Sequence, residues 1–174
     1  MGVLAIFDAE GTWGQTHVCD HLLEHNLQAL GVRWGRQYIE AGVQLDIDVL
    51  APLHRLWGTS SVERVRWGAG EGTRPQTPPD ALAVHWVQSG TLLVYLQARD
   101  GYVGVLCEAG EWISIPAGLA CALDAGGTSD VDLLLFLAAV KAPPARQELS
   151  TSSLPSHEAF VETMLEMTGY ANDE

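Results

Sequence analysis

Apolar and polar positions follow two different periods along the chain, and the period changes near residue 62. Before that point, apolar residues recur every three or four positions, a spacing typical of helices that bury one face. After it, short apolar runs are separated by glycine, proline and aspartate, which is typical of antiparallel strands. The pattern therefore predicts a mainly β protein with helices near its start.

The amino-terminal part is predicted to hold a short strand, a turn at 10–12 and two helices. The first helix is expected to begin after Thr16 as N-cap and to end before Gly31. The second is expected over 40–57, with Pro52 as a local disturbance. The apolar faces predicted for the two helices are Val18, Leu22, Leu27 and Leu30 for the first, and Val43, Ile47, Leu50, Leu53 and Trp57 for the second.

The remaining elements are expected to be strands followed by one short helix. The prolines and glycines of 68–80 predict a loop at the mouth of a barrel, and Ser156 is predicted to cap the last helix. That helix would pack through Phe160, Met164 and Met167 on the outside of the barrel. The predicted strands are 62–67, 82–88, 91–98, 102–107, 112–115, 119–123 and 131–138.

Length and composition favour one domain over residues 1–174, with 47% hydrophobic residues to form its core. We divide it into an amino-terminal strand and helices at 1–61, a barrel at 62–140, and a tail with a carboxy-terminal helix at 141–174. The three cysteines are too few for a disulfide framework and are expected to be reduced thiols. No targeting or membrane-spanning stretch is recognisable, so a cytoplasmic protein is expected.

Charge restricts the partners. Nine basic and 22 acidic residues give a formal net charge of −13, which opposes binding to nucleic acid and to anionic membranes. The expected partner is a small-molecule substrate or ligand, and the oligomeric state is left open.

The spacing of two glycines, a proline and a cysteine indicates a particular fold far more specifically than composition does. Gly110 is followed after five residues by Pro116-Ala117-Gly118 and, two residues later, by Cys121. This resembles the second signature of the cupin barrels, G-x5-P-x-G-x2-H, with cysteine at the histidine position. The first cupin signature, H-x-H-x3-E-x6-G, then corresponds to Thr77, Pro79, Ala83 and Gly90. The resemblance implies a cupin double-stranded β-helix, or jelly-roll barrel.

Beyond the general cupin pattern, the chain resembles the acireductone dioxygenases, which use iron or nickel. The similarity is strongest over 105–108 and 112–117 and extends loosely over most of 1–140. It implies that Thr77, Pro79, Ala83 and Cys121 stand where that family has its metal ligands, and that His85 stands where it has an arginine. Proline and alanine cannot ligate a metal, so we expect no bound iron or nickel, no cofactor and no dioxygenase activity.

Strand alternation suggests a different chemistry for the same interior. If Ala83 points into the barrel, His85 and Val87 do too, and Trp86 does not. Cys121 faces the same space by its motif position. A cationic imidazole would lower the pKa of a nearby thiol, so His85 and Cys121 are the predicted catalytic pair for proton transfer. The predicted substrate-binding residues are Thr77, Ala83, Val87, Trp86, Trp112 and Arg74.

Other interpretations stay open at this point. Cys121 can simply fill apolar space, and His85 can be a hydrogen-bonded core residue. A relocated metal would need His85, Cys121 and an acid such as Asp80 or Glu108. The H-x-x-E-H pattern of His21, Glu24 and His25 matches a zinc peptidase motif, but its place opposite the predicted apolar face favours a solvated helix surface.

These observations yield three hypotheses of function. The first is a metal-independent isomerase, cyclase or lyase in a biosynthetic or tailoring pathway. The second is a non-catalytic small-molecule binding or sensor protein. The third is a cupin metalloenzyme with a moved site.

Overall fold

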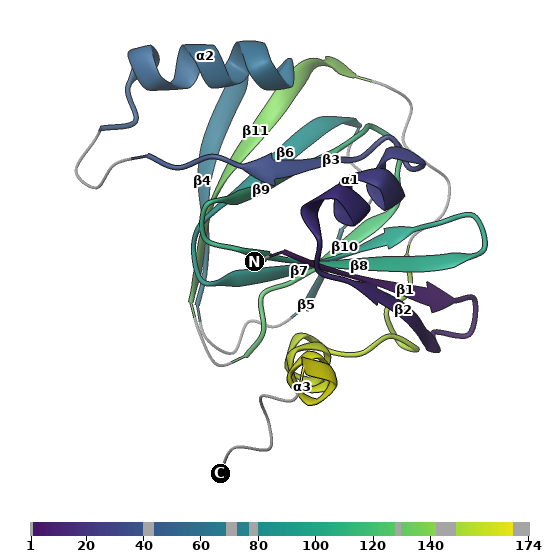
Figure 1. Cartoon of the computed structure of the whole chain (residues 1–174). Helices are drawn as coiled ribbons and strands as arrows, with labels where there is room; N and C mark the ends of the chain where they lie inside the picture. Colours follow the sequence, from purple (N-terminus) through teal and green to yellow (C-terminus); the bar gives the residue numbers. More distant parts are fainter. Residues whose placement is uncertain are drawn as a thin grey trace.

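A computed structural model describes residues 2–39, 44–68, 73–76, 80–127, 130–141 and 149–168, excluding the side chains of 73–76 and of residue 141. Two antiparallel sheets pack face to face, with a helix on the outside of each (Figure 1). The mainly β jelly-roll architecture predicted from the sequence is confirmed. No helix within the described residues is long and apolar enough to cross a membrane.

The first sheet has six strands in the order β2-β1-β8-β7-β10-β5, and the second has five in the order β3-β9-β6-β11-β4. The first sheet contains β1 (Val3–Asp8), β2 (Trp13–His17), β5 (Thr73–Gln76), β7 (Thr91–Gln97), β8 (Gly101–Glu108) and β10 (Cys121–Asp124). The second contains β3 (Arg33–Arg36), β4 (Ser61–Trp67), β6 (Ala81–Ser89), β9 (Glu111–Ile115) and β11 (Val131–Lys141).

Strand alternation sorts the apolar side chains into three clusters. The central cluster lies between the sheets, with Val87, Leu96, Ile113, Cys121 and Leu133 among its members. A second cluster lies on the outer face of the six-stranded sheet, and a third on the outer face of the five-stranded sheet. Each outer cluster is covered by one helix.

Helix α2 (Ile47–Trp57) covers the five-stranded sheet. Asp46 caps it by accepting hydrogen bonds from the backbone N–H groups of Asp48 and Val49. Leu53 and Trp57 are buried, as predicted, whereas Ile47 is 77% exposed at the first turn. The helix begins at Ile47 and not near residue 40 as predicted. Val43, which was expected on its apolar face, lies outside the described residues.

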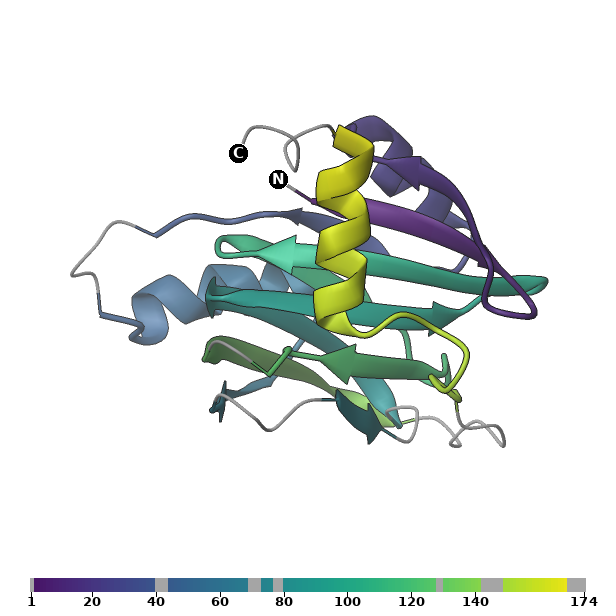
Figure 2. The same cartoon turned by 90° about the horizontal axis from the view of Figure 1, so that it is seen from below.

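Helix α3 (His157–Thr168) crosses the six-stranded sheet (Figure 2). The Oγ atom of Ser156 accepts a hydrogen bond from the N–H of Ala159, as expected for the predicted cap. Phe160 and Met164 are buried on the sheet, but Met167 is 54% exposed and was wrongly predicted to pack there.

The first helix differs most from its prediction. Thr16 lies in β2, where it pairs with Ala5, and α1 (Asp20–Gln28) begins after Cys19. Its buried residues are Leu23 and Leu27, whereas the predicted Val18 and Leu22 are about 40% exposed. The helix is rotated relative to the expected face because Leu23 contributes to the central cluster with Trp34 of β3.

Strands β2, β3 and β5 were not predicted. Strand β3 has two arginines and one glycine in four residues, so it carries no apolar alternation. Strand β5 lies inside the predicted loop and includes Pro75, which the sheet tolerates because β5 is an edge strand.

Candidate functional site

The barrel interior presents His85 from the middle of β6. Its cross-strand neighbours are Ile113 of β9 and Leu135 of β11, both apolar. Val87, two residues further along the strand, belongs to the central cluster, and Ala83 is 2% exposed. The inward orientation expected for His85 and Val87 from strand alternation agrees with this placement.

The imidazole of His85 is buried at 4% exposure, and burial lowers its pKa to about 4. A protonated ring would have to leave water without a compensating charge, so the neutral form is favoured. Its Nδ1 atom has no hydrogen-bond partner within the part of the chain that the structure describes. A buried nitrogen without a partner is destabilising by about 1–3 kcal/mol, which argues against a core histidine held by hydrogen bonds.

Cys121 enters the same interior from the opposite sheet. It begins β10, pairs with Leu96 of β7 and is 1% exposed. Burial raises the pKa of its thiol to about 11. The sequence predicted the reverse, a thiol with its pKa lowered by a cationic imidazole; that prediction is wrong because burial in an apolar interior keeps both groups neutral.

Two of the predicted substrate-binding residues lie outside the barrel. Trp86 and Trp112 pack with Trp57 of α2 in the outer cluster, at ring-centroid distances of 5.9 and 5.4 Å from Trp57. The indole N–H of Trp86 donates to the carbonyl of Gln37 at 3.0 Å. Their place in this cluster gives them a role in holding α2 and removes them from the interior site.

Two further predicted residues cannot be placed at the site. Thr77 lies outside the described residues, and so does the side chain of Arg74. The backbone of Arg74 belongs to β5 and pairs with Leu123 of β10.

The donor set does not fit an iron or nickel ion of the cupin type. Ala83 is a methyl group at the third ligand position, and Cys121 offers one thiol at the fourth. No group of three or more histidine, cysteine, aspartate or glutamate side chains suited to a metal occurs among the described residues. Asp80 and Glu108, considered for a relocated site, are exposed, whereas His85 and Cys121 are buried.

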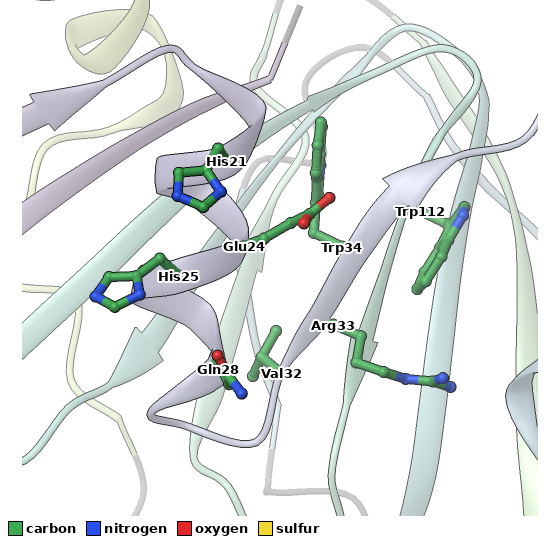
Figure 3. Close-up of a pocket in the computed structure, with 8 residues that line it drawn as sticks. All are labelled: His21, Glu24, His25, Gln28, Val32, Arg33, Trp34 and Trp112. Atoms are coloured by element: carbon green, nitrogen blue, oxygen red, sulfur yellow. The ribbon is translucent and has the colours of Figure 1, made fainter.

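A separate cleft of about 490 Å³ lies between α1 and the sheet edge at β3 (Figure 3). Sequence analysis did not predict it, because it joins two segments whose packing depends on the whole fold. The H-x-x-E-H residues line it and are exposed, in agreement with a solvated helix surface. Its lining residues are His21, Glu24, His25, Gln28, Val32, Arg33, Trp34 and Trp112.

Comparison with solved structures defines the class of fold. Acireductone dioxygenase from Bacillus anthracis, with a cadmium ion in its active centre, superimposes with a TM-score of 0.64 and 12% sequence identity, covering 83% of this chain and 97% of that one. A 3,4-ketoisomerase from Helicobacter canadensis matches with a TM-score of 0.47 and 8% identity, over 80% of this chain and 98% of the other. A double mutant of a 3'-monoepimerase from Streptomyces bikiniensis matches with a TM-score of 0.46 and 14% identity, over 65% and 66% of the two chains.

The two packed antiparallel sheets and the match at a TM-score of 0.64 show that the chain has a cupin fold. No family model matches the sequence, and no curated protein matches it.

Proposed function

We propose that this protein is an acireductone-dioxygenase-like cupin that acts on a small organic molecule without an iron or nickel ion. Its reaction would be a proton transfer, such as an isomerisation, cyclisation or dehydration, in a cytoplasmic biosynthetic or tailoring pathway. The observation that carries the proposal is the imidazole of His85, which is neutral, buried and without a partner for Nδ1 in the described structure.

The protonation states support this chemistry. With pKa values of about 4 and about 11, His85 is an unprotonated base and Cys121 a protonated thiol at neutral pH. In an isomerisation, the imidazole takes a proton from one substrate atom, and the resulting imidazolium faces a substrate anion in an apolar interior. Return of a proton to a second atom completes the reaction, which consumes no oxidant.

The apolar neighbours of His85 support a small substrate with one dominant polar group. Ile113 and Leu135 flank the imidazole across the sheet, so the rest of a bound molecule would contact mainly hydrocarbon. A carbonyl or hydroxyl group of that molecule would supply the hydrogen bond that Nδ1 lacks.

The test is proton exchange in D₂O. EDTA-treated protein is incubated with acetoin and dihydroxyacetone, two enolisable α-hydroxyketones, and loss of the exchangeable C–H signal is followed by NMR. We expect exchange above the buffer rate, abolished in His85→Gln and retained in His17→Gln, which alters a half-buried histidine on β2. Exchange that survives in a folded His85→Gln protein, or that requires added metal, would overturn the proposal.

A second candidate, non-catalytic binding, is favoured by one observation. Burial moves the pKa values of His85 and Cys121 in opposite directions away from neutrality, so neither group is tuned to titrate at working pH. For this candidate, the same α-hydroxyketones would shift the histidine signals saturably without any proton exchange.

A further inference from the structure

The inner face of the five-stranded sheet is accessible to solvent on one side of His85. On the β9 side, Ile113 pairs with His85 and is completely buried. On the β11 side, Leu135 pairs with His85 and is partly exposed, although it packs against the central cluster. Within the described part of the chain, the surroundings of His85 are therefore closed toward β9 and accessible toward β11.

The partly exposed surface continues along β11 to the next inward-facing residue. Leu137 follows Leu135 by two positions, so strand alternation places both on the same face of the sheet. Leu137 is partly exposed and pairs with Ala83, whose side chain is a single methyl group. In the other direction along β11, Leu133 is only 1% exposed. The accessible surface therefore runs from His85 toward the pair formed by Ala83 and Leu137.

The edge strand β4 is where this surface meets bulk water. Glu63 pairs with Leu135 and Ser61 pairs with Leu137, so each continues one of the two rows to the edge of the sheet. Both are exposed, as polar side chains at an open edge are expected to be. A molecule that reaches His85 would therefore enter over β4 and cross β11.

This route is lined by hydrocarbon on β11 and ends at a polar atom. Leu135 and Leu137 form an apolar strip, and Nδ1 of His85 has no hydrogen-bond partner within the described structure. Successive inward-facing residues of a strand are about 6.6 Å apart, which is about the length of a five-carbon chain. One polar group followed by an aliphatic chain matches this arrangement. A chain that carries hydroxyl groups would lose its bound water there without gaining hydrogen bonds in return.

We propose that Leu135 and Leu137 determine substrate specificity by binding an unbranched aliphatic chain of about three to five carbons along β11. The substrate class is then an aliphatic ketone and not a polyhydroxylated one. Its carbonyl group accepts or relays the hydrogen bond at Nδ1 of His85, and its chain lies on the leucine strip. This inference rests on the function proposed above, because it places the reacting group of the substrate at His85.

The probes are 2-butanone, 2-pentanone and 2-heptanone, with erythrulose as the hydroxylated counterpart of 2-butanone. Dissociation constants for the full-length protein are measured from saturable NMR shifts. We expect each added methylene on the partly exposed strip to tighten binding about twofold, and erythrulose to bind about fourfold or more weakly than 2-butanone. Equal affinities along the ketone series, tight binding of erythrulose, or no saturable binding would overturn the proposal.

Shortened side chains test whether the strip itself recognises the chain. Leu135→Ala and Leu137→Ala should each reduce the affinity ratio between 2-heptanone and 2-butanone about twofold. Leu135→Met and Leu137→Met should preserve the ratio, because methionine keeps a hydrocarbon surface of similar volume. Leu82→Ala is the matched control, at a half-buried position on the outer face of the same sheet, and should leave the ratio unchanged. Folded alanine variants that keep the full wild-type ratio would contradict the assignment.

Proton exchange in D₂O separates this inference from the proposed reaction. A chain-length preference that depends on Leu135 and Leu137, without exchange of any C–H proton, would support the specificity assignment and refute proton transfer. Exchange that depends on His85 but has the same KM for every chain length would support proton transfer and refute the assignment. His85→Gln should abolish exchange and keep the chain-length preference.

Discussion

His85 and Trp86 are neighbours on β6 and face opposite sides of the same sheet. His85 lies between Ile113 and Leu135 in the barrel interior, whereas Trp86 packs against Trp57 beneath α2. One strand thus carries both the candidate chemical group and the anchor for a helix. A one-residue shift in the register of β6 would exchange these two surroundings and destroy both.

The buried imidazole should make stability depend on pH. Its pKa is about 4 in the folded protein and about 6.5 in the unfolded chain, so the unfolded state takes up the proton first as pH falls. The free energy of unfolding should drop by about 2–3 kcal/mol from this group between pH 7 and pH 4.5. Urea titrations give the free energy of unfolding of the wild type and of His85→Phe at each pH. The loss of stability toward acid pH should be larger in the wild type, which carries the buried imidazole. His17→Gln should keep the wild-type slope; parallel curves for wild type and His85→Phe would contradict the prediction.

Thiol reactivity should follow burial. Cys19 is exposed, whereas Cys107 and Cys121 are buried and have pKa values raised above the ordinary thiol range. Brief treatment with iodoacetamide at pH 7.5 should add one label to the native protein and three in denaturant, as intact mass would show. The native Cys19→Ser variant should take up none, and rapid labelling of Cys121 would indicate an interior open to solvent.

Two glycines at positions that resemble the cupin signatures should be needed for backbone geometry. Gly90 and Gly118 have φ values of +79° and +85°. A Cβ at Gly118 would meet nothing within 4 Å, so Gly118→Ala should cost about 1–2 kcal/mol for the backbone conformation alone. A Cβ at Gly90 would lie 2.5 Å from the carbonyl oxygen of Asp130, so Gly90→Ala should cost more. Urea denaturation gives the free energy of unfolding of both variants. An equal loss of stability in Gly90→Ala and Gly118→Ala would contradict the predicted clash at Gly90.

Asp124 should fasten the start of α3. Its carboxylate accepts hydrogen bonds from the backbone N–H of His157 at 3.0 Å and of Gly126 at 2.9 Å. Asp124→Ala should destabilise the protein by about 3 kcal/mol and speed amide hydrogen exchange in α3. Glu158→Gln is the matched control, because Glu158 accepts an exposed hydrogen bond from the N–H of Gly127. This substitution should lower the free energy of unfolding by less than about 1 kcal/mol. Unchanged exchange in Asp124→Ala would show that apolar packing alone holds α3.

Local periodicity was enough to predict most of the strands that form the core, although not β3, which contributes Trp34. The inward orientation of His85 and Val87 follows from a period of two, which holds wherever a strand is regular. The apolar runs at 112–115 and 119–123 predicted β9 and β10 to within two residues.

What sequence analysis missed depends on contacts between distant segments. The choice between Leu22 and Leu23 as the buried side of α1 is decided by Trp34, which lies on a strand with no apolar alternation of its own. The opposite pKa shifts at His85 and Cys121 follow from the burial of both groups, and motif spacing does not encode burial. The cleft at β3 was missed for the same reason.

The position of α3 also limits how copies of this chain can associate. Phe160 and Met164 occupy the outer face of the six-stranded sheet together with Phe7 and Tyr95. The hydroxyl of Tyr95 donates to the carbonyl of Pro155 at 2.6 Å, which fixes the segment that leads into the helix. A second copy cannot stack its sheet on the residues that α3 covers, so any dimer formed on this side while α3 stays docked would contact the helix and not the sheet beneath it.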